Sequence, residues 1–173
     1  MNGRCGASIG TGRGSSCTRM NILDVFLAYE ADFEKTFVDD RWSRLERYFT
    51  EDAVYETYGT AGRRTEGRTA IFRRLRAELD AFDRRCAWRK VRTTGGPEVD
   101  GNRILRNWVA TFHIDGAADL MIEGSERLTF EGDRIAVLEE EPSETAERHL
   151  LTWMKLNPQV FARPNERVPI AAS

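Results

Sequence analysis

A glutamate in the last third of the chain has the surroundings that acid–base chemistry requires. The residues from Glu126 to Phe130 alternate between polar and apolar side chains, which is typical of a strand with one buried face. This period of two places Glu126 on the same face as Leu128 and Phe130, so we expect it to point inward. A carboxyl group in apolar surroundings has its charged form disfavoured, and its pKa therefore rises. Such a group can donate a hydrogen bond or transfer a proton near neutral pH.

An alternative without chemistry is also open for Glu126. An internal arginine, for example Arg106, or a backbone group could hold the carboxylate. Burial against an arginine would favour a protein that binds a ligand without transforming it.

An earlier segment, from Ala53 to Tyr58, is rich in aromatic and β-branched residues and is predicted to be a short strand. Tyr55 and Thr57 share one face of it, and Glu56 lies on the other. Tyr55 is the better-placed inward polar group, either as a hydrogen-bond donor to a ligand oxygen or simply as a core residue. A shift of one residue would reverse the faces and bring Glu56 inward as a base.

A histidine lies near the end of the longest predicted strand, residues 103–114. If His113 faced inward, it could pair with Glu126 for acid–base work. We favour the outward orientation, in which His113 belongs to a dimer surface. Trp108 and Phe112 lie on the opposite face of this strand and are predicted to face the core.

The last predicted strand ends in three consecutive acids, Glu139, Glu140 and Glu141. Such a run is typical of an exposed strand end. Alternation also allows Glu139 to point inward, on the same face of the strand as Val137. Glu139 would then lie close to Glu126, and the pKa of one of the two carboxyl groups would rise strongly.

The composition limits the classes of function. With 173 residues, 40% hydrophobic and 31% charged, the chain fits one ordinary soluble domain with tails. A net charge of −2 and no basic face argue against nucleic-acid binding. No apolar run approaches the ~20 residues of a membrane span. The two histidines and three cysteines have no metal-ligand spacing, and no Gly-rich cofactor motif is present, so we expect no metal, no cofactor and a cytoplasmic protein.

Helical periodicity comes first along the chain and strand periodicity afterwards. Helices are predicted over residues 22–37, 42–49, 69–84 and 144–156, and strands over 53–58, 87–94, 103–114, 120–130 and 134–140, with a loop or small hairpin over 59–67. Gly95-Gly96-Pro97 is expected to interrupt the second strand, and Pro158 to end the last helix. This order predicts an α+β fold: three N-terminal helices on a curved, mainly antiparallel sheet that encloses a pocket, plus a C-terminal helix.

The chain divides into three parts. Residues 1–19, rich in Gly, Ser and Arg, are predicted to be a disordered tail, and translation could begin at Met20 instead of Met1. Residues 20–142 form the predicted domain. Residues 143–173 contain the last helix and a loose tail.

Three short motifs resemble one family when taken in order. They are Asp52-Ala53-Val54 at a strand start, Gly67-Arg68-Thr69-Ala70-Ile71 at a helix start, and Phe130-Glu131-Gly132-Asp133-Arg134-Ile135 at a late hairpin. Over residues 20–142 the chain resembles the SnoaL-like branch of the NTF2-like superfamily, which has a cone-shaped α+β fold and includes ketosteroid isomerases, polyketide cyclases and dehydratases. The resemblance implies a single pocket but not its use.

The resemblance also implies roles for individual positions. Glu126 falls where ketosteroid isomerases carry the acid that helps to bind a developing oxyanion. Their general base would fall near Thr57 and their tyrosine near Phe33, and neither residue can take that role. Phe33, Phe37, Thr57, Trp108 and Phe112 are expected to shape the pocket.

We therefore expect a small SnoaL-like protein that binds a hydrophobic, oxygenated small molecule. Glu126 and Tyr55 would catalyse proton transfer in an isomerisation, cyclisation or dehydration. The alternative is a non-catalytic ligand-binding or accessory domain of the same fold. A homodimer through the outer sheet face is expected in either case.

Overall fold

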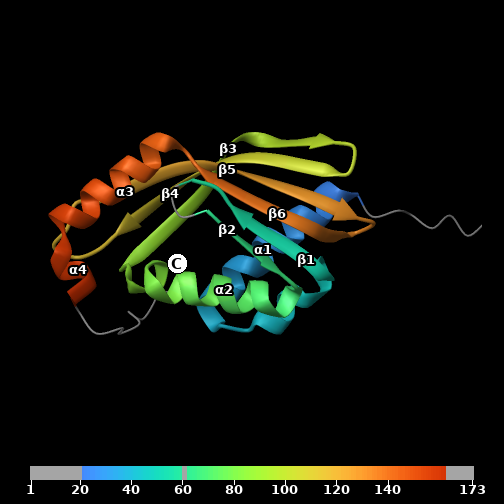
Figure 1. The fold of residues 1–173 in the computed structure, drawn as a ribbon, viewed down its shortest axis with the longest axis horizontal. Coiled ribbons are helices and arrows are strands. Elements are labelled where there is room, and N and C mark those ends of the chain that lie inside the picture. The colour runs from blue at the N-terminus through green and yellow to red at the C-terminus, as the bar shows by residue number, and fades with distance from the viewer. Residues whose placement is uncertain (1–20, 60–61, 163–173) are drawn as a thin grey trace, which may run out of the picture.

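The computed structural model describes residues 21–59 and 62–162, with side chains up to residue 160 (Figure 1). The predicted tail 1–19, the choice between Met1 and Met20 and the end of the chain from residue 163 lie outside the described residues. No helix in the described part is long and apolar enough to cross a membrane. The expected homodimer and cytoplasmic location stay predictions.

Helix α1 (Ile22–Asp39) begins the described fold and presents an apolar face to the sheet. The Asn21 side chain caps its first turn by accepting a hydrogen bond from the Leu23 N–H at 3.1 Å. The helix ends at Asp40, which has a left-handed backbone with φ 59°. The other helices are the 3₁₀ segments η1 (Trp42–Tyr48) and η2 (Asp83–Arg85), α2 (Arg68–Ala81), α3 (Glu144–Leu156) and α4 (Pro158–Ala162).

Six strands form one curved sheet in the order β2-β1-β6-β5-β4-β3. They are β1 (Phe49–Thr57), β2 (Arg63–Glu66), β3 (Trp88–Asp100), β4 (Arg103–His113), β5 (Leu120–Glu131) and β6 (Arg134–Pro142). All neighbours are antiparallel except β1 and β6, which are parallel. Helices α1 and α2 lie on the same side of the sheet, and α3 and α4 lie at one end of it (Figure 1). The predicted α+β fold class is confirmed.

Aromatic side chains join the helices to the sheet in the main core. Tyr29 of α1 meets Phe49 of β1 edge to face at 5.5 Å between ring centroids, and Phe49 meets Phe72 of α2 at 5.4 Å. All three rings are buried. Edge-to-face contacts of this kind add about 0.5–1.5 kcal/mol to the burial of the rings. They hold α1 and α2 at a fixed distance from the sheet.

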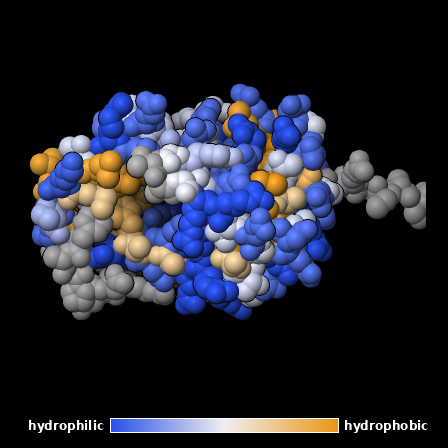
Figure 2. All heavy atoms as spheres, viewed as in Figure 1, coloured by the Kyte–Doolittle hydropathy of each residue, from blue (hydrophilic) through white to orange (hydrophobic). Residues whose placement is uncertain are grey.

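The C-terminal helix closes one end of the fold. Its buried Trp153 donates a hydrogen bond from Nε1 to the Ala118 carbonyl at 2.6 Å and packs edge to face against Phe82. Phe82 in turn contacts Phe112 of β4, with ring centroids 5.0 Å apart. The outward side of α3 is apolar in part, with Leu151, Met154 and Leu156 exposed, and Figure 2 shows this apolar surface over the helix.

One of the two sequence expectations about breaks in the elements was wrong. Strand β3 continues through Gly95-Gly96-Pro97, with an irregular register between Thr94 and Glu98 that absorbs these residues. Pro158 follows the end of α3 as predicted, but it also begins the short helix α4, a position where proline is well tolerated.

Candidate functional site

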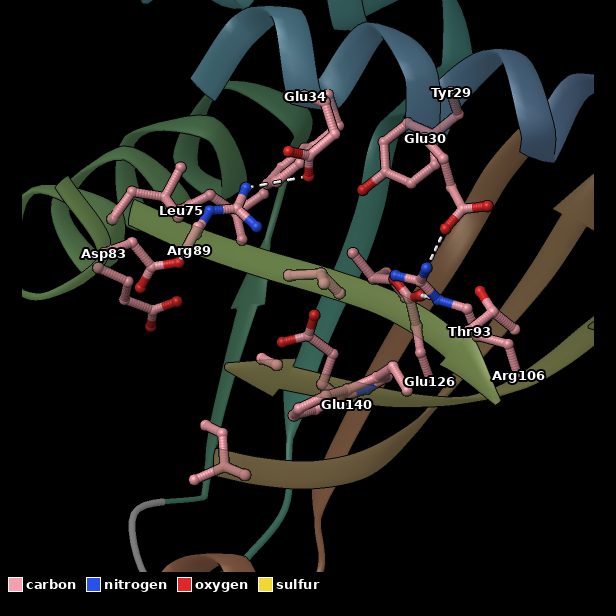
Figure 3. Close-up of a pocket in the computed structure, with 18 of the residues that line it drawn as sticks. Tyr29, Glu30, Glu34, Leu75, Asp83, Arg89, Thr93, Arg106, Glu126 and Glu140 are labelled. Carbon is pink, nitrogen blue, oxygen red and sulfur yellow. Dashed lines mark hydrogen bonds and ion pairs between the residues drawn. The ribbon is translucent and has the colours of Figure 1, made fainter. Parts of the chain in front are cut away.

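A cavity of about 350 Å³ lies between the concave face of the sheet and helices α1 and α2. A volume of this size suits a small organic molecule. Its apolar wall consists of Phe33, Leu75, Leu79, Val91, Trp108, Ala110, Phe112, Ile122 and Leu138. Among these side chains stand six carboxylates and two arginines, several of which are labelled in Figure 3.

Strand register sets charged residues side by side across the cavity floor. Arg106 of β4 is directly opposite Glu126 of β5, and Glu126 is directly opposite Glu140 of β6. Directly opposite residues have Cβ atoms roughly 4.5–5.5 Å apart and point to the same side of the sheet. The arginine and the two glutamates therefore enter the cavity together (Figure 3).

The arginine joins this row to helix α1. Arg106 forms a close ion pair through Nε with Glu126 and another through Nη1 with Glu30. Only 2% of the Glu126 side chain is exposed. On the other side, the buried Tyr55 hydroxyl donates a hydrogen bond to Oε2 of Glu140 at 2.5 Å. Each glutamate of the pair thus has its own fixed partner.

Burial raises the pKa of both glutamates. For Glu126 it raises the pKa to about 7, although the positive charge of Arg106 works in the opposite direction and the negative charge of Glu140 adds to the rise. Burial likewise raises the pKa of Glu140, while the hydrogen bond from Tyr55 lowers it. Two nearby carboxylates in low dielectric surroundings do not readily ionise together. This pair can therefore hold and exchange a proton near neutral pH.

A second charged group lines the same cavity nearer α2. Arg89 of β3 binds Glu34 through Nη2 at 3.0 Å, and its Nε lies 3.5 Å from Oδ2 of Asp83. Burial raises the pKa of Asp83 to about 6, and the charge of Arg89 moderates the rise. Arg89 also lies over the Phe37 ring, with 4.0 Å between its guanidinium carbon and the ring centroid.

The residues predicted for the site are partly brought together. Glu126, Tyr55, Phe33, Trp108 and Phe112 line the cavity. The other two predicted pocket residues, Phe37 and Thr57, do not line the cavity.

Phe37 is buried beneath Arg89. Thr57 accepts a hydrogen bond from Arg74 Nη2 at 2.8 Å through its hydroxyl. Neither belongs to the cavity lining, because arginine side chains occupy the space above them.

Two of the alternative site residues face outward. Glu56 pairs with Arg64 on the outer side of β1, so the strand does not shift by one residue. His113 points away from the cavity as we favoured, with Nδ1 2.6 Å from Asp119 and its ring stacked on Trp88. Neither can contact Glu126.

Glu139 does not face Glu126, and the reason is an irregularity in β6. The pairing of β5 with β6 shifts between Thr129 and Phe130, so Ile135 and Leu138 both face the core although they are three residues apart. Glu139 therefore points outward, where it accepts a hydrogen bond from Tyr58 at 2.8 Å. Glu140 takes the inward place.

Sequence reasoning missed Glu140, Glu30 and Arg89. Glu30 carried a usable signal, because it lies four residues after Phe26 and three before Phe33, on the apolar face of α1. Glu140 carried none, since nothing local marks the irregularity in β6. Within the described residues, no group of three or more histidine, cysteine or acidic side chains is arranged to hold a metal ion.

Gly124 packs closely against Trp108 of the cavity wall, and we expect Gly124→Ala to destabilise the protein by roughly 1–3 kcal/mol. A Cβ atom there would lie 2.5 Å from the Glu141 carbonyl oxygen and 2.7 Å from Cζ2 of Trp108, so backbone or indole must move. Urea denaturation measures the loss. Gly96→Ala is the matched control, since a Cβ at Gly96 meets nothing within 4 Å and should change stability little. Equal stability of both variants would contradict the close packing at Gly124.

No protein-family model matches the chain, and no curated protein matches it. Solved structures do. TerC, co-crystallised with polyporic acid, superposes with a TM-score of 0.57 at 13% identity over 76% of this chain and 98% of that one. An NTF2-like protein of unknown function from Burkholderia pseudomallei has a TM-score of 0.57 at 14% identity, covering 75% and 95%. A protein with a ketosteroid isomerase-like fold from Catenulispora acidiphila, in complex with trimethylamine, has a TM-score of 0.53 at 20% identity, covering 75% and 90%.

These sequence identities are low, so the similarity establishes the fold and does not establish the function. The function must be argued from the side chains of this chain. The order of helices and strands and the curved six-stranded sheet agree with the superpositions. The chain has the cone-shaped fold of the NTF2-like superfamily.

Proposed function

We propose that the protein binds an apolar, oxygen-bearing small molecule in its cavity and transfers a proton on it by means of Glu126 and Glu140. The observation that carries the proposal is the pair of inward carboxyl groups, side by side on β5 and β6 within an apolar wall. Desolvation favours a shared proton on this pair near neutral pH. The TerC structure, which holds polyporic acid, supports a small organic occupant for a cavity of this fold.

The partners of the two glutamates assign their roles. Arg106 stabilises the ionised form of Glu126, which makes Glu126 the base. Glu140 is held by a neutral phenol, that of Tyr55, and acts as the acid. Tyr55 is thus a positioning residue for Glu140, in place of the direct ligand contact that the sequence predicted.

The proposed reaction begins with a ligand whose carbonyl lies near Glu140. Glu126 takes a proton from the carbon next to the carbonyl, and the C–H electron pair forms a carbon–carbon double bond. The carbonyl π electrons move to oxygen, which takes the proton of Glu140. Return of a proton from Glu126 to the same or a conjugated carbon, and of the hydroxyl proton to Glu140, restores both groups. The same first step serves isomerisation, cyclisation and dehydration.

Hydrogen–deuterium exchange tests this proposal. In D₂O the wild-type protein should accelerate exchange of the methyl protons of para-hydroxyacetophenone, followed by proton NMR. Glu126→Gln should lower the acceleration by about 10²–10⁴-fold, the usual contribution of a general base. Glu123→Gln, on the exposed side of the same strand, is the control and should exchange at the wild-type rate. An undiminished rate in Glu126→Gln would refute the assignment.

A second candidate function is binding without catalysis. The observation that favours it is the double ion pair of Arg106, which ties Glu126 to Glu30 and restrains its carboxylate. Under this alternative para-hydroxyacetophenone would bind to the wild-type protein and its methyl protons would exchange no faster than in buffer.

A further inference from the structure

The cavity contains two separate arginine–carboxylate groups, one toward each end. The first joins Glu30, Arg106 and Glu126, and the second joins Glu34, Arg89 and Asp83 (Figure 3). We infer that the second group is a subsite in which Arg89 binds an uncharged oxygen of the ligand, so that the ligand carries oxygen at both ends of an apolar body. This inference rests on the proposed function and specifies its ligand.

Arg89 is buried in a way that leaves hydrogen-bonding capacity unused. Its side chain is 4% exposed and lines the cavity. A guanidinium has five N–H donors and no acceptor. One donor binds Glu34, whereas Nε is buried and has no hydrogen-bond partner among the described residues, its distance to Asp83 being 3.5 Å. Buried donors are normally satisfied, so a small adjustment around an incoming acceptor would lower the free energy.

The spacing of the two groups sets the length of the ligand. Glu30 and Glu34 lie one turn apart on α1, which is roughly 6 Å along the helix. Arg106 binds the first and Arg89 the second. Most of the other side chains that line the cavity are apolar. A single aromatic ring with oxygen atoms at opposite positions spans this distance.

The charges around Arg89 favour a neutral oxygen over an anion. Glu34 and Asp83 already supply two carboxylates for one guanidinium. A ligand carboxylate would meet their repulsion, while a ligand ammonium would meet that of Arg89. A carbonyl or hydroxyl oxygen accepts an N–H without adding charge. The shift of the Asp83 pKa to about 6 still leaves this carboxyl mostly ionised at pH 7.5.

Four phenols that differ only at the far end of the ring test the inference by isothermal titration calorimetry at pH 7.5. They are para-cresol, para-hydroxybenzamide, para-hydroxybenzoate and tyramine. Wild-type protein should bind para-hydroxybenzamide about tenfold more tightly than para-cresol, the effect of one good hydrogen bond. Para-hydroxybenzoate and tyramine should both bind more weakly than the amide.

Variants of Arg89 test whether this residue causes the tighter binding of para-hydroxybenzamide. Arg89→Met should remove the tenfold preference, so that para-cresol and para-hydroxybenzamide bind this variant with equal affinity. Arg92→Met, an exposed arginine on the same strand, should keep the preference. If circular dichroism shows that Arg89→Met is unfolded, Arg89→Lys takes its place, since a lysine keeps the charge but loses the planar fork and should lower the preference.

The outcomes separate the inference from the proposed function. Equal affinities for para-cresol and the amide, or a preference that survives at Arg89→Met, would overturn the subsite and leave the cavity as a ligand site. Tightest binding of tyramine would also overturn it, by showing that the carboxylates select a cation. Binding of none of the four phenols would overturn the subsite and the proposed ligand class together.

Discussion

The protein should lose stability as the pH rises from about 5 to 8. Burial raises the pKa of Glu126 to about 7, that of Asp83 to about 6, and those of Glu140 and Glu30 above their usual range. Unfolded glutamates ionise near pH 4.3, so between these values the folded protein holds more protons than the unfolded chain. The free energy of unfolding must then fall with rising pH. For Glu126 alone the loss is roughly 4 kcal/mol and is complete above its folded pKa.

The other shifted carboxylates act at lower pH and in the opposite sense. Asp39 has its pKa lowered to about 2 by the hydrogen bonds from Arg44, and Asp32 has its pKa lowered by the hydrogen bond from Lys35. Their stabilisation is present above pH 4 and is lost as the pH falls through the folded pKa. Stability should therefore be greatest near pH 5, at the acidic end of the usual range of about pH 5 to 8.

Urea denaturation at half-unit intervals between pH 4 and 8.5 measures this profile. In Glu126→Gln the fall between pH 5 and 8 should become much shallower, whereas Glu123→Gln should follow the wild type. A smaller fall remains in the variant, because burial still raises the pKa values of Asp83 and Glu30 and the hydrogen bond with Asp119 raises that of His113. Each of these contributions is lost as the pH rises through the folded pKa. Stability that increases from pH 5 to 8 in the wild type would contradict the buried, protonated pair.

The periodicity of apolar residues predicted those features that depend on a single helix or strand. The apolar period of α1 gave a helix from about residue 22, and the structure has Ile22–Asp39. The predicted last helix has the same bounds as α3, Glu144–Leu156, and Ser143 caps it through a hydrogen bond from the Ala146 N–H. Alternation along β5 likewise predicted that Glu126 points inward. Each of these follows from side-chain periodicity alone.

Most features that depend on two elements could not be predicted from the sequence. The inward place of Glu140 arises where the pairing of β6 with β5 shifts, and no residue in β6 marks that position. The contact between Arg89 and Glu34 joins residues 55 positions apart, so only the tertiary fold reveals it. Arg106 was an available partner for Glu126, but its second bond to Glu30 depends on how α1 crosses the sheet. The charged site is thus a product of register and helix packing.

Arg106→Met should destabilise the protein by about 3–5 kcal/mol at pH 8, the usual effect of removing one partner from a buried ion pair. The loss arises because Glu126 and Glu30 both remain without their cation, and the pKa of Glu126 should rise further. At pH 5, where Glu126 is protonated, the loss should be smaller. Arg103→Met, exposed on the same strand, should have little effect at either pH.

A double-mutant cycle shows whether this effect belongs to the pair. Arg106→Met combined with Glu126→Gln should recover more than half of the stability lost in Arg106→Met at pH 8, since the uncompensated charge is then absent. Losses that simply add would mean that Arg106 stabilises the fold through its packing and not through Glu126. Recovery would instead establish that the arginine keeps the carboxylate ionised inside an apolar cavity. That is the state in which Glu126 can act as a base, and the cycle therefore connects the stability of the fold to the proposed proton transfer.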